Sequence, residues 1–257
     1  MKKNIILHSL SVLKLGLMTA IALAFLLSAN QSRAAVGDTF TDDNFTYTVL
    51  TEEGTAGTVS ASQQSESVPS GAVTIPDAVN QGPVTYSVTE IGNSSFQNCI
   101  GLTRIIIPDS VTIIGSYAFE NCSSLSSVAI PDSVTRIEHG VFNRCEQLPP
   151  ILFSTGRKIL VRYSNTNVAT EYSIPNTVTY IASSAFQFCD NLTSITIPDG
   201  LTKIGNGAFN ECSSLSSISI PDSVNHIGDS AFGNCRALTG VTIPDSVTEI
   251  GRYAFSG

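Results

Sequence analysis

Apolar and polar positions alternate over short stretches through most of the chain, and one arrangement returns many times. In the segment Leu192–Cys212, Ile195 and Ile197 lie two residues apart, so their side chains share one face of a short strand. Pro198 follows directly and ends the hydrogen-bonding pattern of that strand because proline lacks an N–H group. The pattern therefore predicts very short strands, each closed by a proline turn.

The second half of the same segment has a different spacing. Leu201 and Ile204 indicate a second short extended stretch. Ala208, Phe209 and Cys212 then fall one and four residues apart, as a brief helical turn would place them on one face. We therefore expect each unit to contain two short strands and one short helical turn.

This unit repeats along the chain. A phenylalanine recurs with a constant period, broken by a single longer step after Phe142, at Phe96, Phe119, Phe142, Phe186, Phe209, Phe232 and Phe255. The dipeptide Ile-Pro follows the same rhythm, with one further irregular step between Pro76 and Pro108. A fixed period of 23 residues predicts stacked coils, because one coil has too few apolar positions to bury a core alone.

The pattern L-x-x-I-x-I-P-x-S-V-x-x-I-G-x-x-A-F-x-x-C resembles the BspA-like family of leucine-rich repeats, from Val73 to Gly257. The resemblance implies a β-rich repeat solenoid, with leucine-rich-repeat-like coils of about 23 residues that contain short parallel strands and short turns. It also implies a role in surface display, adhesion or protein binding, and it brings no catalytic residue.

The sequence is expected to divide into three regions. Residues 1–34 begin with Lys2 and Lys3, continue with an apolar run and end in a small-residue cleavage pattern, and are interpreted as a secretory signal peptide. Residues 35–72 alternate aromatic and polar positions, which indicates an N-terminal β-rich cap. Residues 73–257 are the repeats, with an irregular hairpin coil near 149–172.

The charge balance excludes one class of partner. Without residues 1–34, nine of the 13 Lys and Arg remain against 21 Asp and Glu, a net charge of about −12. Binding of nucleic acid depends on basic side chains that displace counterions, so nucleic acid is not expected as a partner. No membrane span is expected after signal cleavage, and the protein is expected to be secreted or held at the cell surface.

The irregular coil carries the first group of candidate protein-binding residues. Arg157, Lys158 and Arg162 provide a third of the remaining positive charge, and Phe153 and Tyr163 stand beside them. Basic and aromatic side chains are frequent interface anchors. The alternative is an insertion with a solvated tip.

A second group occupies one repeat position that varies from coil to coil. We call this position the variable column, and it contains Ile113, Arg136, Tyr180, Lys203, His226 and Glu249. Variation on a fixed scaffold is where binding specificity could be encoded, although neutral surface variation gives the same pattern. We take Arg136, Tyr180, Lys203 and His226 as candidate protein-binding residues.

Two further repeat positions have polar or sulfur chemistry. Six cysteines share one position between inward-facing residues and are interpreted as buried free thiols, with disulfides as the alternative, at Cys99, Cys122, Cys145, Cys189, Cys212 and Cys235. Five aspartates follow the Ile-Pro step and could bridge calcium or form solvated turns, at Asp109, Asp132, Asp199, Asp222 and Asp245. No zinc spacing, nucleophile motif or histidine cluster is present in the sequence.

We therefore expect a non-enzymatic exported or cell-surface protein, without cofactor or metal, that binds another protein or an extracellular-matrix component. Two alternatives remain open. The first is a structural spacer or self-associating element, since the last coil has no cap and offers an apolar face for a homodimer. The second is a carbohydrate-binding module, suggested by a hydroxyl-rich outer strand face.

Overall fold

The computed structural model describes residues 35–42, 44–53, 56–63 and 69–257, so the expected signal peptide lies outside the described residues. Within these ranges the chain forms nineteen strands and no helix. The strands are β1 (Thr39–Thr41), β2 (Phe45–Glu53), β3 (Ala56–Gln63), β4 (Gly71–Thr74), β5 (Ala78–Gln81), β6 (Val84–Ile91), β7 (Leu102–Ile106), β8 (Ile113–Ile114), β9 (Ser127–Ala129), β10 (Arg136–Ile137), β11 (Ile151–Phe153), β12 (Ile159–Tyr163), β13 (Glu171–Ser173), β14 (Tyr180–Ile181), β15 (Ser194–Thr196), β16 (Lys203–Ile204), β17 (Ser217–Ile218), β18 (His226–Ile227) and β19 (Glu249–Ile250).

The N-terminal strands form an antiparallel unit that is joined to the first coil. β1, β2 and β3 pair antiparallel, and β3 then pairs parallel with β6. Phe45, Tyr47 and Val49 are buried, as the alternating pattern predicts. Antiparallel pairing also continues past residue 72, because β5 and β6 form a hairpin. This hairpin lies within the irregular step between Pro76 and Pro108.

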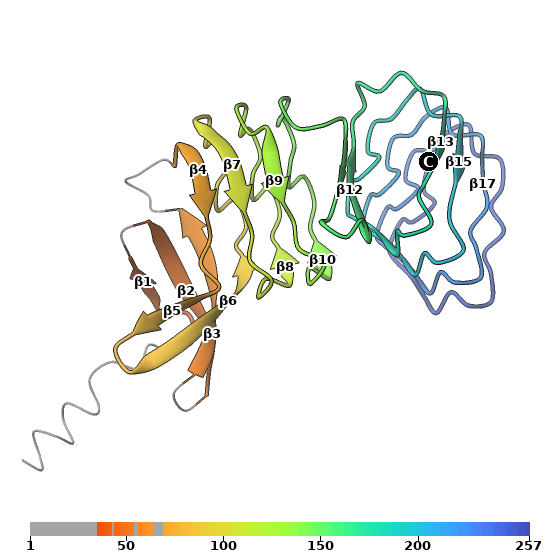
Figure 1. Cartoon of the computed structure of the whole chain (residues 1–257). Helices are drawn as coiled ribbons and strands as arrows, with labels where there is room; N and C mark the ends of the chain where they lie inside the picture. Colours follow the sequence, from red (N-terminus) through yellow and green to blue (C-terminus); the bar gives the residue numbers. More distant parts are fainter. Residues whose placement is uncertain (1–34, 43, 54–55, 64–68) are drawn as a thin grey trace, which may run out of the picture.

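Parallel pairing joins the coils that follow. Paired residues in neighbouring coils lie one repeat period apart, as in Glu90 with Ile113 and Ile113 with Arg136. Figure 1 shows β4, β7 and β9 on one side of the first coils and β8 and β10 on the opposite side. After the irregular coil the same arrangement returns, with β13, β15 and β17 in one sheet and β14, β16, β18 and β19 in another.

The expectation of short helical turns is wrong, because these segments are turns without helix in the described part of the chain. In the coil of Phe209, the N–H groups of Ala208, Asn210 and Cys212 bond to carbonyls three residues earlier. The N–H groups of the alternate residues Gly207, Phe209 and Glu211 bond instead to the next coil, at the carbonyls of Asp229, Ala231 and Gly233. We call this second set the axial ladder. A helix would need both sets within one coil.

Left-handed backbone residues produce the alternation. Two residues with positive φ flank the phenylalanine in each regular coil, for example Tyr117 at 57° and Asn121 at 58°. The first of these positions also holds Ser94, Gly140, Ser184, Gly207, Ser230 and Tyr253. An L-residue in this conformation interrupts a right-handed helix. The turns are therefore shaped to direct hydrogen bonds along the solenoid axis.

Two ladders of side chains fill the space between the turns and the strands. The phenylalanine rings stack coil on coil, with centroids 4.9 to 5.4 Å apart. The cysteines are buried free thiols, and Sγ of Cys122, Cys145, Cys212 and Cys235 donates to the carbonyl 26 residues earlier at 3.0 to 3.2 Å. The core is thus a column of apolar groups and satisfied thiols.

The irregular coil divides this column. β11 and β12 form an antiparallel hairpin, and β12 contributes residues to the cores on both of its sides. Ile159 and Val161 belong to the N-terminal core, whereas Leu160 and Tyr163 belong to the C-terminal core. Figure 1 shows the coils before β12 side-on and those after it nearly end-on, so the solenoid axis changes direction at the hairpin. We call the stretch from residue 142 to residue 163, where the two cores meet, the junction.

Candidate functional site

The variable column lines a hollow on the sheet of β14, β16, β18 and β19. This hollow has a volume of about 350 Å³, and its walls include Tyr180, Lys203, His226 and Glu249. Arg136 and Glu138 reach it from the other side of the junction. The parallel register places the four C-terminal members directly beside one another. The fold therefore gathers five of the six residues of the variable column.

Basic and acidic side chains both line this hollow. Nε of Arg136 lies 2.9 Å from Oε1 of Glu138, and Nδ1 of His226 lies 2.9 Å from Oε2 of Glu249. Between these pairs, Nζ of Lys203 lies 5.0 Å from the centroid of the Tyr180 ring, a cation–π distance. The column therefore presents both signs of charge rather than one.

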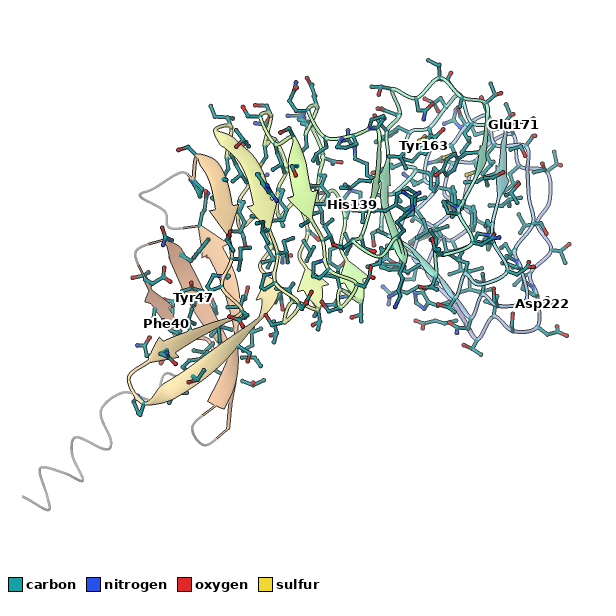
Figure 2. The ribbon with its side chains drawn as sticks, viewed as in Figure 1. Phe40, Tyr47, His139, Tyr163, Glu171 and Asp222 are labelled. Atoms are coloured by element: carbon teal, nitrogen blue, oxygen red, sulfur yellow. The ribbon has the colours of Figure 1, made fainter. Side chains whose placement is uncertain are left out.

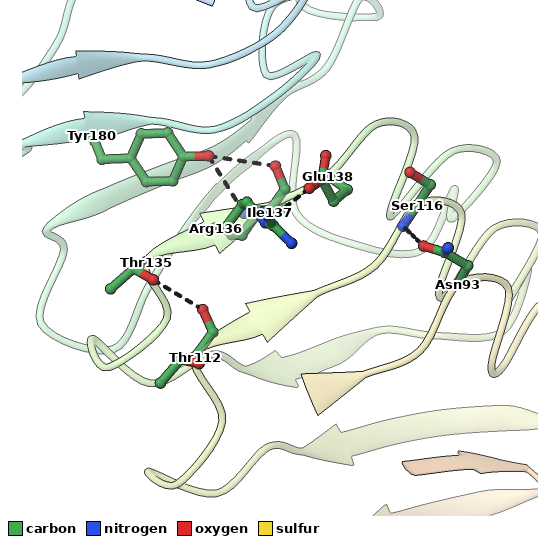
Figure 3. Close-up of polar contacts among 8 residues, drawn as sticks. All are labelled: Asn93, Thr112, Ser116, Thr135, Arg136, Ile137, Glu138 and Tyr180. Carbon is green, nitrogen blue, oxygen red and sulfur yellow. Dashed lines mark hydrogen bonds and ion pairs between the residues drawn. The ribbon is translucent and has the colours of Figure 1, made fainter. Parts of the chain in front are cut away.

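Tyr180 is buried and connects the two halves of the molecule. Only 7% of its surface is exposed, and its hydroxyl lies 3.4 Å from both the nitrogen and the oxygen of Ile137 (Figure 3). Burial raises the pKa of this hydroxyl. Tyr180 is thus a support beneath Lys203, and its ring is not an exposed anchor.

The basic residues of the hairpin are separated by the structure. Arg157 and Lys158 lie at the exposed tip, where the Arg157 guanidinium is 4.1 Å from the centroid of the Phe153 ring. Arg162 lies near the other end of β12, where it pairs with Leu152. The five candidate residues of this coil therefore do not form one patch.

Tyr163 takes the place of phenylalanine in the ring stack. Its ring lies 5.0 Å from that of Phe186, and only 3% of its surface is exposed. A slightly shortened step from Phe142 brings it into this register. Tyr163 is therefore a core residue, and its burial removes it from any outer surface. Figure 2 labels Tyr163 and His139 on the two flanks of the junction.

Arg162 lies in a second hollow, at the junction itself. Its Nη1 donates to the carbonyl of Cys145 at 2.9 Å, and burial lowers the pKa of its guanidinium. The hollow has a volume of about 310 Å³ and is also lined by Glu120, Arg144 and Ser184. We call it the junction cavity.

Several lining residues were not identified from the sequence. Glu138 lines the first hollow and stands at a repeat position that is glycine in five coils and alanine at Ala182, the five being Gly92, Gly115, Gly205, Gly228 and Gly251. At Gly205 an added Cβ would lie 2.6 Å from the nitrogen of Ser183. The two exceptions flank the junction, and this departure from the repeat was the signal that could have identified Glu138.

The remaining polar repeat positions stabilise contacts between coils. Hydroxyls on the outer strand face donate to the preceding coil, as Thr193 Oγ1 does to the carbonyl of Thr170 at 3.0 Å and Ser216 Oγ to that of Thr193 at 3.2 Å. Asp132 accepts hydrogen bonds from Ser154 Oγ and from the N–H of Gly156. Across the described ranges, no three His, Cys, Asp or Glu residues are grouped as a metal site would require, and no helix could span a membrane.

Comparison with known proteins gives a family match over most of the chain. The model described as the BspA type leucine rich repeat region matches residues 79–164 and 161–257, with six copies. Among curated proteins, none matches this chain.

Three solved structures are similar. A leucine-rich repeat protein from Bacteroides ovatus is 34% identical over 84% of this chain and 56% of its own, with a TM-score of 0.48. The T. pallidum leucine rich repeat protein is 25% identical over 83% of this chain and 86% of its own, with a TM-score of 0.45. A leucine rich cell surface protein from Faecalibacterium prausnitzii is 28% identical over 85% and 73%, with a TM-score of 0.44.

The chain spans only 56% of the length of the Bacteroides ovatus protein. The family assignment rests on the repeat model, whose two matched ranges extend from residue 79 to residue 257 and follow the same coils that pair in the structure. The chain belongs to the BspA-type leucine-rich repeat family.

Proposed function

We propose that this chain is a non-enzymatic, exported or cell-surface protein that binds another protein or a matrix component through the variable column. One observation carries the proposal: a repeat position whose chemistry changes from coil to coil lines a hollow, while the isoleucine position directly after it is constant and preserves the scaffold. Membership of a repeat family and the cell-surface description of the Faecalibacterium prausnitzii protein support the proposed location of this protein, exported or at the cell surface.

The chemistry of the column indicates the kind of partner. Lys203 and His226 stand between the acidic Glu138 and Glu249, so a partner loop with both signs of charge fits better than a polyanion. The side chains project from paired strands, which lowers the entropic cost of ordering them on binding. The protein's strongly acidic composition acts in the same direction, because it repels polyanions at a distance.

Binding to an array of extracellular-matrix and serum proteins tests the proposal. The purified protein is compared with a column variant, Lys203→Ala with His226→Ala, and with a hairpin-tip variant, Arg157→Ala with Lys158→Ala. We expect saturable binding that the column variant weakens about tenfold or more, as loss of interface anchors does. The tip variant should bind like the unmodified protein.

Two results would contradict this assignment. If only the tip variant lost binding, the contact surface would be the exposed Arg157 and Lys158. If no array member bound saturably, the binding role would be rejected in favour of the structural spacer.

Self-association is a second candidate, favoured by apolar groups on the last coil. Ile243, Ile250 and Phe255 are 39%, 48% and 37% exposed, and clustered exposed apolar groups are typical of interfaces. Sedimentation equilibrium should then show a concentration-dependent dimer that Phe255→Ser weakens. A monomer at all concentrations would reject this candidate.

A further inference from the structure

The axial ladder is interrupted at one place inside the solenoid. Before the junction, the N–H groups of Tyr117, Phe119 and Asn121 bond to carbonyls of the next coil, at His139, Val141 and Asn143. After it, the N–H groups of Ser184, Phe186 and Phe188 do the same, at Asn206, Ala208 and Asn210.

The coil between these two has donors of the same kind and no acceptors for them. The N–H groups of Gly140, Phe142 and Arg144 make no hydrogen bond to any part of the protein that the structure describes. The reason is the hairpin: residues 159–163 are a strand there, whereas the regular coils have a turn segment whose carbonyls accept the ladder. Gly140 and Phe142 are buried, and an unpaired N–H in such a position is costly.

The unpaired donors share one direction. Gly140 and Arg144 have φ of 67° and 58°, close to the 57° and 58° of Tyr117 and Asn121 one coil earlier. The same backbone conformation directs the same N–H groups along the axis, here toward the hairpin and into the junction cavity, which all three residues line. Alternating backbone handedness with aligned N–H groups is a recognised anion-binding geometry.

Two guanidinium groups add positive charge to this cavity. Arg144 and Arg162 line it, and no carboxylate lies within 4.0 Å of either side chain among the described residues. The one acidic lining residue, Glu120, accepts a hydrogen bond from Nε2 of Gln97. A single Nη1 bond to Cys145 leaves most of the five donors of Arg162 available.

We propose that the junction cavity binds one tetrahedral oxyanion, a phosphate or sulfate group, through the N–H groups of Gly140, Phe142 and Arg144 and the guanidinium of Arg162. A tetrahedral group offers enough oxygens for three backbone donors and an arginine fork, whereas a carboxylate has two. The volume of about 310 Å³ also accommodates an organic group that carries the anion. This inference does not rest on the proposed protein-binding role.

Amide NMR titration of the purified protein with inorganic phosphate, at constant ionic strength, tests the site. We expect saturable shifts of the Gly140, Phe142 and Arg144 amides, and no shift of Phe119 or Phe209, whose N–H groups are paired. Arg162→Gln should raise the dissociation constant about tenfold or more, as loss of a charged hydrogen bond does. Arg157→Gln is the matched control on the same hairpin and should have no effect.

Arg162→Gln could lose phosphate binding simply because it misfolds, so a second variant is needed. Arg144 is exposed, and Arg144→Gln should weaken phosphate binding while the fold is retained. Sulfate should bind like phosphate and acetate several-fold more weakly. Phenyl phosphate is the arm that distinguishes the sources: tighter binding than inorganic phosphate indicates an ester ligand, and weaker binding a free ion. Non-saturating shifts, equal loss in Arg157→Gln, or acetate binding as tight as phosphate would overturn the proposal.

Discussion

From Phe186 to Phe255 each coil is joined to the next by the same contacts, whereas from Phe142 to Tyr163 those contacts change. In the regular stack, backbone N–H groups, phenylalanine rings and thiols all connect neighbouring coils. At the junction, side chains of Arg162, Tyr180 and Ser184 make most of the connections, together with hydrogen bonds from the hairpin tip to Ile130 and Asp132. Regular contacts thus give stability, and their interruption leaves polar groups free for other uses.

A substitution in the ring stack should lower the free energy of unfolding more than any other change considered below. Phe209 is fully buried between Phe186 and Phe232, with centroid distances of 4.9 and 5.1 Å. Phe209→Ala should lower the free energy of unfolding in urea by about 3–5 kcal/mol, because the rigid stack cannot close the cavity. Phe188→Ala, at a 51% exposed position of the neighbouring coil, is the control and should cost far less. Equal losses would contradict the assigned core.

The glycine position should distinguish the regular stack from the junction. In Gly205→Ala the new Cβ would meet the backbone of Ser183 at 2.6 Å, so we expect a loss of about 1–3 kcal/mol in urea unfolding. Glu138→Ala, at the equivalent position beside the junction, removes a partly exposed ion pair with Arg136 and should cost about 1 kcal/mol or less. If Glu138→Ala were the more damaging, the tight approach of coils would not explain the glycines.

The thiols should make the protein sensitive to alkaline pH. Burial raises the pKa of Cys235 to about 11, from an ordinary value of 9.0. The unfolded chain releases this proton first, so stability is full below pH 9 and falls as the pH rises through about 11. Cys235→Ser keeps a donor for the Phe209 carbonyl but does not titrate in this range. It should reduce the fall, measured by urea unfolding at pH 9 and 11, by on the order of 1 kcal/mol. An identical fall in both proteins would contradict the assignment.

The smallest effect concerns the side-chain connections at the junction. The hydroxyl of Tyr180 lies 3.4 Å from the nitrogen and the oxygen of Ile137, which are long hydrogen bonds. Tyr180→Phe should therefore lower the unfolding free energy by about 1 kcal/mol or less. The hydrogen exchange of residues near Ile137 should increase more than that near Phe209. Uniform acceleration in both halves would show that the hydroxyl does not act locally.

The strands and the stacked coils could be predicted from the sequence because one repeated pattern encodes them. Ile195 with Ile197 and the proline after them define a strand in any coil, and the repetition makes each position readable several times. The N-terminal strands were likewise indicated by the alternation of Phe45, Tyr47 and Val49, but their antiparallel pairing was not. These features depend on local spacing alone.

The turns and the candidate site were harder to predict for physical reasons. Tyr117 and Glu211 adopt left-handed φ, a conformation their residue types rarely take, so their spacing favoured a helical turn. Tyr163 is buried because the shortened step from Phe142 returns it to the ring register, whereas its basic neighbours indicated a surface. The separation of Arg157 from Arg162 depends on the register of the expected hairpin, which places Arg162 opposite Leu152 and which the sequence did not specify.

The division at β12 also has a mechanical consequence. A pull along the solenoid loads the regular stack through many backbone hydrogen bonds, whereas at the junction the load passes to a few side chains, to β12 and to the backbone bond from Thr155 to Ile130. We expect the two halves to separate there first when the protein is stretched, while the coils on either side remain intact. The junction would then be the mechanically weakest part of the solenoid.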